Sequence, residues 1–115
     1  MHETRDYLDY IQDIFESIND IEKFIEGIEF NDFVNDKKTI NAVVRSLEVI
    51  GEAAKKVPET IRKKYPTLPW KNMAKMRDKL IHEYFGIDVE IVWKVTKDEI
   101  PPLKPLIQQI LKNLQ

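Results

Sequence analysis

The chain has 115 residues, of which 43% are hydrophobic and 33% charged, with a formal net charge of −2; this composition is typical of one globular domain. It has no cysteine and only two histidines, His2 and His82, which excludes disulfides, thiolate catalysis, and Cys-based or multi-His metal sites. No apolar run approaches the ~20 residues of a membrane span. We therefore expect a single cytoplasmic domain over residues 1–115, with no cofactor and no membrane association.

Two long amphipathic helices are predicted in the first half of the chain. The first spans about residues 4–27, and its apolar stripe recurs at alternating steps of four and three: Tyr7, Ile11, Ile14, Ile18, Ile21, Ile25 and Ile28. The second spans about residues 36–56, with a stripe made of Ile40, Val43, Leu47, Ile50, Ala54 and Val57. Because a short turn at residues 27–32 links helices of similar length, we expect an antiparallel hairpin.

The second half predicts shorter helices separated by prolines. A short helical piece covers residues 59–64, and a rigid connector, Pro66–Trp70, leads into a helix over about residues 70–84 that stops at Gly86. Asp88 is a good N-cap for the next helix, which Pro101-Pro102 must break or kink, and a last helix begins near Leu103. No strand is predicted. The expected architecture is an all-α bundle of four main helices with one additional short helix.

Charge is distributed unevenly along the chain. Residues 1–36 hold two cations against eleven acids, whereas residues 55–79 hold nine cations against two acids. The basic segment contains Tyr65 and Trp70 and could follow a phosphate backbone. The same pattern also fits an ordinary lysine-rich surface that packs near an acidic helix.

The segment from Arg77 to Gly86 holds the residues best suited to chemistry. On the predicted helix, Arg77 falls in an apolar stripe with Trp70 and Leu80, where a guanidinium must be paired or face a cavity or interface. Asp78 lies four residues before His82, a spacing that would orient the imidazole. Arg77 and His82 are about 140° apart on an ideal helix. A site that uses both therefore needs either a distorted helix end or two subunits meeting at a two-fold axis.

Arg77-x4-His82-x-Tyr84 resembles the RX4HXY signature of the HepT-like branch of the HEPN superfamily. The resemblance extends over nearly the whole chain in blocks that occur in the same order: residues 42–54 (AVVRSLEVIGEAA), 65–70 (YPTLPW), 82–88 (HEYFGID), 92–93 (VW) and 103–106 (LKPL). The combination is far more specific than Arg-x4-His alone, and no motif position departs from the pattern.

The resemblance implies an all-α, HEPN-like four-helix bundle that forms a homodimer, with two Arg-x4-His motifs in one cleft. It implies a metal-independent endoribonuclease that acts as the toxin of a toxin–antitoxin system, with RNA as substrate and Arg77 and His82 as catalytic residues. It further implies a cognate MNT-type nucleotidyltransferase antitoxin that silences the toxin by transferring AMP to Tyr84.

Two supporting residues and two other functions remain open at this stage. Asp78 is expected to orient His82, and Glu52 either pairs with Arg77 or is an ordinary exposed glutamate. The chain could instead be a non-catalytic helical subunit that binds a nucleotidyltransferase. It could also be a nucleotide-binding module that uses Arg77 for phosphate without cleaving anything.

Overall fold

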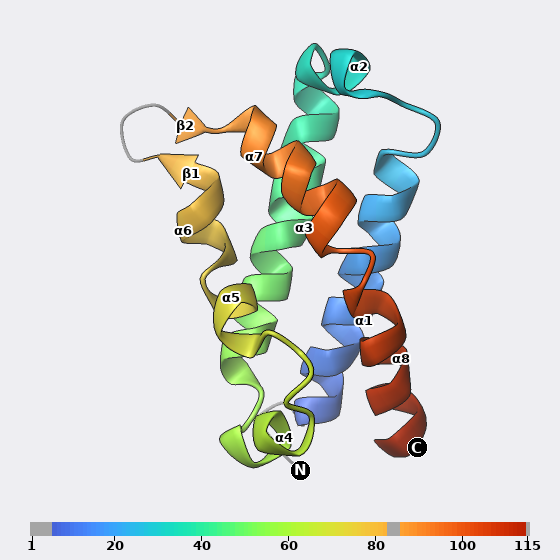
Figure 1. The fold of residues 1–115 in the computed structure, drawn as a ribbon, viewed down its shortest axis with the longest axis vertical. Coiled ribbons are helices and arrows are strands. Elements are labelled where there is room, and N and C mark those ends of the chain that lie inside the picture. The colour runs from blue at the N-terminus through green and yellow to red at the C-terminus, as the bar shows by residue number, and fades with distance from the viewer. Residues whose placement is uncertain (1–5, 83–85, 115) are drawn as a thin grey trace.

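A computed structural model describes residues 6–82 and 86–114 of the chain (Figure 1). The helices are α1 (Tyr7–Phe24), α2 (Phe30–Val34), α3 (Lys37–Lys56), α4 (Glu59–Lys64), α5 (Trp70–Ala74), α6 (Met76–Leu80), α7 (Val89–Lys94), the π-helical turn η1 (Val95–Glu99) and α8 (Leu103–Leu114). Two short strands, β1 (Ile81–His82) and β2 (Gly86–Ile87), pair antiparallel. The predicted all-α class is confirmed. No helix in these ranges is long and apolar enough to cross a membrane.

Helices α1 and α3 form the central antiparallel hairpin, as predicted from their apolar stripes (Figure 1). The middle of each stripe is buried: Ile11, Ile14, Ile18 and Ile21 on α1, and Val43, Leu47, Ile50 and Ala54 on α3. The ends of the first stripe, Tyr7, Ile25 and Ile28, are only partly buried, and α1 is shorter than the predicted 4–27. Helix α8 packs against α1 and adds its own buried stripe, Leu103, Ile107, Ile110 and Leu111.

The start of α3, predicted near residue 36, is fixed by Asp36 as the N-cap. The Thr39 backbone N–H donates to Asp36 Oδ1 at 3.0 Å and the Thr39 hydroxyl donates to Oδ2 at 2.6 Å. These bonds favour the ionised carboxylate, so the pKa of Asp36 is held below its ordinary value, chiefly by the Thr39 hydroxyl. This cap sets where α3 begins.

The link between α1 and α3 contains a helix that the sequence did not predict. Residues around Asn31-Asp32 were interpreted as a simple turn, but they lie in α2. Its Phe33 is fully buried, and the ring centroid lies 5.0 Å from that of Trp93 on α7. This tertiary contact, which pairs residues far apart in sequence, explains why local turn signals were misleading.

The expected breaks in the C-terminal half are present. Asp88 caps α7 by accepting from the Ile91 backbone N–H at 3.2 Å. The helix then passes into η1, and α8 begins only after Pro101 and Pro102. The proline pair therefore ends one helical segment and lets α8 turn back along α1.

The prediction of a single helix over residues 70–84 is wrong. The segment is split at Lys75 into α5 and α6, helix α6 ends at Leu80, and the chain then becomes extended. Gly86 has a φ of +73°, a left-handed conformation that suits glycine, and it pairs with His82 across the β1–β2 ladder. The Asp88 N–H donates to the Leu80 carbonyl at 3.0 Å. The small hairpin thus diverts the backbone away from a helix end at Tyr84, which itself lies outside the described residues.

Candidate functional site

Arg77 lies on α6, at the surface beside α3. Its side chain is 62% exposed, and its Nε donates to Glu48 Oε2 on α3 at 3.1 Å. Trp70, Met73 and Leu80 are buried as expected, but Met76 continues the buried set instead of Arg77. The expected place of Arg77 in the apolar stripe is therefore wrong, because the break at Lys75 changes the helical phase, but the expected pairing of its guanidinium is observed with Glu48. The guanidinium faces solvent and is tethered through Nε, so its two terminal nitrogens are the ones suited to meet a substrate phosphate.

His82 follows α6 in the strand β1, and the structure places it through its backbone. Since the chain leaves the helix after Leu80, the 140° separation of Arg77 and His82 on an ideal helix does not apply. The distorted helix end considered from the sequence is observed in the single chain, and the meeting of two subunits stays a prediction. The motif therefore joins the last turn of a helix to a β-hairpin within one chain.

Asp78 cannot orient His82 in the way the sequence suggested. That expectation needed both residues one turn apart on the same helix, but α6 ends between them. Asp78 is an exposed residue of α6. The prediction of a helical Asp78–His82 pair is wrong, because the β1–β2 ladder takes over from the helix at residue 81.

Glu48 is the site residue that sequence reasoning missed. Its side chain is 21% exposed, so the carboxylate is partly shielded where it meets Arg77. The sequence feature that could have indicated Glu48 is Gly51, which lies about one turn later on α3. A Cβ built on Gly51 would lie 2.9 Å from the Met73 carbonyl oxygen. A buried glycine at such a close approach marks where a second helix rests, and Glu48 lies beside that contact.

Glu52 does not pair with Arg77. It lies on the exposed side of α3, at a hollow of about 200 Å³. The residues that line this hollow are Tyr10, Asp13, Arg45, Val49, Glu52, Ala53 and Lys56. Glu48 is thus the partner of Arg77, and Glu52 lies at a hollow that is also lined by two cations, Arg45 and Lys56.

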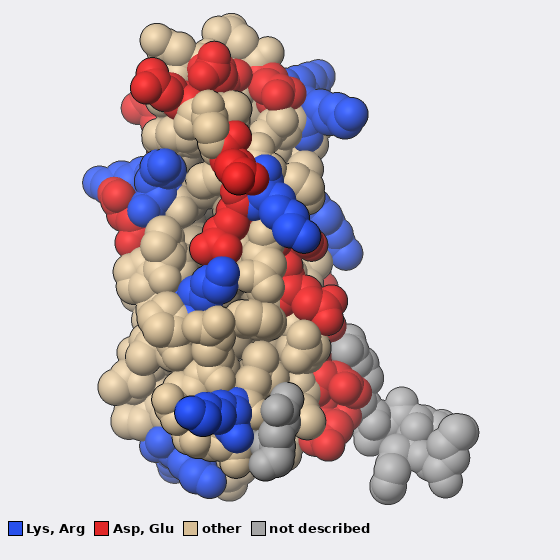
Figure 2. Space-filling model, turned by 90° about the vertical axis from the view of Figure 1, so that its right-hand side faces the viewer, with Lys and Arg blue, Asp and Glu red and all other residues tan. Residues whose placement is uncertain are grey.

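The predicted separation of charge along the chain is only partly visible on the face drawn in Figure 2. That face shows many Asp and Glu at the upper end and along the right-hand edge, whereas Lys and Arg are scattered among them and also lie at the mostly uncharged lower end. Lys79, near Arg77, is already engaged with Glu99 at 2.7 Å, but Lys75 is exposed. Across residues 6–82 and 86–114, no cluster of three or more His, Cys, Asp and Glu side chains could hold a metal ion.

Comparison with known proteins identifies the family. The sequence profile described as "Ribonuclease HepT-like" matches residues 14–110, which include Glu48, Arg77 and the whole hairpin. The chain belongs to the HepT-like family. The resemblance drawn from the Arg77-x4-His82-x-Tyr84 motif is thereby confirmed.

Individual HepT-like relatives match over nearly their full length. "Probable ribonuclease HepT" from Thermococcus cleftensis is 50% identical over 108 residues, covering 94% of this chain and 98% of the relative. A "Putative RNase" from Methanocaldococcus jannaschii is 49% identical over 111 residues, covering 96% and 92%. Another from Caldanaerobacter subterraneus subsp. tengcongensis is 46% identical over 104 residues, covering 90% and 93%. No solved structure matches the chain.

Proposed function

We propose that this chain is a metal-independent endoribonuclease and the toxin of a toxin–antitoxin pair. The observation that supports it best is the Arg77 side chain, exposed and tethered by Glu48 next to the hairpin that carries His82. An always-charged guanidinium suits phosphate oxygens, and an imidazole can move protons near neutral pH. The names of its HepT-like relatives point the same way.

In the proposed reaction, the ribose 2′-OH attacks the adjacent phosphorus atom. One imidazole takes the 2′-OH proton as the new O2′–P bond forms. The P–O5′ bond breaks as a protonated imidazole donates its proton to the leaving 5′ oxygen, giving a 2′,3′-cyclic phosphate and a 5′-hydroxyl. Arg77 stabilises the negative charge of the crowded phosphorane between these steps.

The reaction needs two proton-transfer groups, and each chain has one motif histidine. A homodimer that brings two His82 side chains into one cleft would supply both, one as base and one as acid. The exposed face of α6 around Arg77 is the proposed dimer surface. Light scattering at micromolar concentration checks this arrangement, and a monomer at that concentration would contradict it.

Replacement of His82 tests the ribonuclease proposal. We expect His82→Ala to lower the rate of cleavage of a single-stranded RNA at least about 100-fold, since a positioned acid–base group contributes at least that factor. His2→Ala is the matched control, because it removes the other histidine of the chain and should cleave at the wild-type rate. Cleavage should also persist in EDTA. Cleavage by His82→Ala at the wild-type rate would remove His82 from the mechanism, and no cleavage by the wild-type protein would favour a non-catalytic helical subunit. Loss of cleavage in EDTA would contradict the metal-free mechanism.

The second part of the proposal is regulation by an MNT-type nucleotidyltransferase antitoxin, which transfers AMP from ATP to the Tyr84 hydroxyl and releases pyrophosphate. The added AMP brings bulk and negative charge to the motif that contains the phosphate-binding Arg77, so we expect it to compete with RNA without a change of fold. We expect mass spectrometry of the co-expressed pair to find AMP on the peptide that contains Tyr84, and cleavage to fall with the modified fraction. Tyr84→Phe should remove the added mass and Tyr65→Phe should not. AMP found on Tyr65 would contradict the assignment.

A further inference from the structure

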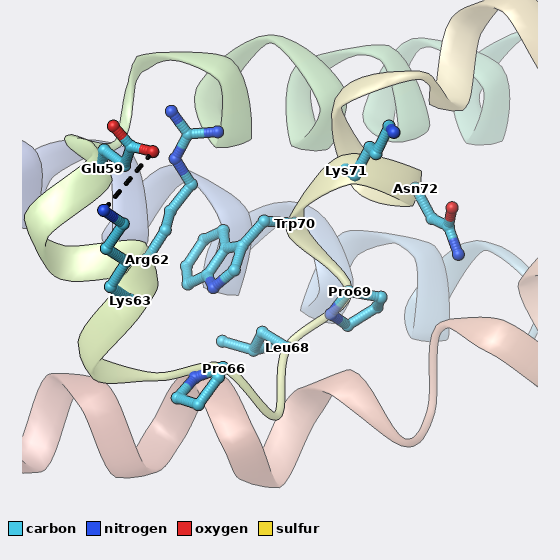
Figure 3. Close-up of a pocket in the computed structure, with 9 residues that line it drawn as sticks. All are labelled: Glu59, Arg62, Lys63, Pro66, Leu68, Pro69, Trp70, Lys71 and Asn72. Carbon is cyan, nitrogen blue, oxygen red and sulfur yellow. Dashed lines mark ion pairs between the residues drawn. The ribbon is translucent and has the colours of Figure 1, made fainter.

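A hollow of about 460 Å³ separates α4 from the start of α5, on a part of the chain that the proposed reaction does not use (Figure 3). It is lined by Glu59, Arg62, Lys63, Pro66, Leu68, Pro69, Trp70, Lys71 and Asn72. In Figure 3, Arg62 and Lys63 lie on one side of the Trp70 ring, and Lys71 and Asn72 lie on the other. We call this hollow the α4–α5 pocket.

The rim of the α4–α5 pocket is positively charged. The lining contains three cations, Arg62, Lys63 and Lys71, and one acid, Glu59. Lys63 Nζ and Glu59 Oε1 are 3.9 Å apart, and both side chains are more than 70% exposed. A loose, solvent-screened pair of this kind contributes little and competes weakly with a bound anion. The pocket is therefore an attractive site for a negatively charged group.

Arg62 adds positive charge to the rim without a contact through its Nε. The Nε is buried, and no hydrogen-bond partner for it is found among the described residues. Because an atom that is closed off from solvent cannot meet a ligand in an open pocket, the contribution of Arg62 is its positive charge at the pocket lining.

The remaining wall is apolar and rigid. Pro66, Leu68 and Pro69 form it together with Trp70, which is only 7% exposed. Trp70 Nε1 donates to the Tyr65 carbonyl at 3.0 Å, so the ring cannot swing out to become an open stacking platform. The pocket thus combines a fixed apolar wall with a cationic rim. A nucleotide, which joins a flat apolar base to a phosphate, fits both parts.

The α4–α5 pocket is also within reach of Arg77 along the chain. Lys71 and Arg77 are six residues apart, which limits their Cα separation to about 22 Å. Helices α5 and α6 follow one another along α3 (Figure 1), and the exposed Lys75 lies between them. A single RNA strand of a few nucleotides could contact the α4–α5 pocket, Lys75 and Arg77.

From these observations we propose that the α4–α5 pocket binds a nucleotide of the RNA strand, with Arg62, Lys63 and Lys71 around its phosphate, while Arg77 acts on a phosphate further along. The inference rests on the proposed ribonuclease function. It assigns the basic segment of the sequence a location and a task, which is to hold the substrate and not to cleave it.

The two tryptophans allow a direct test by NMR. A ten-nucleotide 2′-O-methyl RNA, which cannot be cleaved through its 2′ oxygen, is titrated into the wild-type protein. We expect the indole N–H signal of Trp70 to shift on binding. The Trp93 signal serves as an internal control and should not move, because that ring packs against Phe33 near α2, at the other end of the molecule.

The same site can be tested by removing lysine charges from the pocket and measuring the affinity for the oligonucleotide. Lys63→Gln/Lys71→Gln should weaken binding of the oligonucleotide at least fivefold and reduce its salt dependence. The matched control is Lys23→Gln/Lys37→Gln, which also removes two exposed lysines, but from the ends of α1 and α3 far from α4. We expect the control to change affinity less than twofold. With cleavable RNA, the pocket variant should raise KM and leave kcat unchanged.

The outcomes separate this inference from the ribonuclease proposal. If the protein cleaves RNA but the pocket variant binds as the control does, the pocket inference fails and the ribonuclease stands. If the oligonucleotide shifts Trp70 and the pocket variant loses affinity, but no RNA is cleaved, the pocket stands and the ribonuclease fails. A ten-residue polyglutamate peptide that shifts Trp70 as much as the RNA would overturn the inference in favour of an acidic protein partner.

Discussion

Arg77→Ala is expected to lower the rate of RNA cleavage at least about 100-fold while leaving the fold intact. The removal of a single preorganised donor to a developing negative charge costs about that factor in other enzymes. Stability should change little, since the Arg77 side chain is 62% exposed and exposed ion pairs contribute about 0–1 kcal/mol. Cleavage kinetics and urea unfolding of the same preparation check both statements. Cleavage by Arg77→Ala at the wild-type rate would remove the arginine from the mechanism.

Glu48 should then act through Arg77 as a positioning residue. Glu48→Ala removes the acceptor of the Arg77 Nε–H, so we expect kcat to fall about tenfold with little change in KM. Glu48→Gln keeps an oxygen in place and should restore most of the activity. Glu52→Gln, four residues later on the exposed side of α3, is the matched control. An equal loss in the Glu52 variant would show that the effect is one of general surface charge.

Gly51→Ala is expected to destabilise the protein by about 1–3 kcal/mol, the usual cost of overpacking a well-filled interior. The new Cβ would lie 2.9 Å from the Met73 carbonyl oxygen and 3.7 Å from that of Ala74. These are backbone atoms of α5, so no side-chain rotation can relieve the clash, and α5 and α6 must move away from α3. Because α6 carries Arg77 and α3 carries Glu48, cleavage should fall as well.

The sign of the change in the free energy of unfolding caused by Gly51→Ala distinguishes a clash at this contact from an ordinary effect of helix propensity. In an exposed helix, glycine to alanine stabilises by about 1 kcal/mol, which is the opposite sign. Lys55→Ala, on the exposed surface of the same helix, serves as the control and should leave the free energy of unfolding nearly unchanged. A Gly51→Ala protein that is as stable as the wild type would mean that α3 and α5 do not approach so closely.

The long helices were predictable because their information is local. The isoleucine stripe of α1 and the Asp88 cap of α7 are read from neighbouring residues, and both are confirmed. The end of the 70–84 segment was not predictable in this way. Its apolar spacing continues to Tyr84 with no proline or glycine to interrupt it, whereas the observed β1–β2 ladder depends on the pairing of residues 81–82 with residues 86–87.

The same difference between local sequence information and long-range contacts applies to the candidate site. Arg77 and His82 were proposed because they belong to one short motif, and the resemblance to the HepT-like family followed from it. The partner of Arg77 was missed because Glu48 is 29 residues away in the sequence and meets it only through the packing of α6 on α3. The helical pairing of Asp78 with His82 was wrong because helical spacing was assumed beyond Leu80, where the helix ends.

The opposite charges of α1 and the α4–α6 segment bear on how fast a polyanion arrives and in which orientation. Asp9, Glu16 and Asp20 are exposed on α1, while Lys63, Lys71 and Lys75 are exposed on the other segment. A strand diffusing toward the acidic side is repelled and one approaching the basic side is drawn in, so productive encounters are enriched before any contact forms. This electrostatic bias is short-ranged, because salt at 0.1 M screens charges over a length of about 10 Å. The association rate constant should therefore fall steeply as ionic strength rises, while dissociation responds much less.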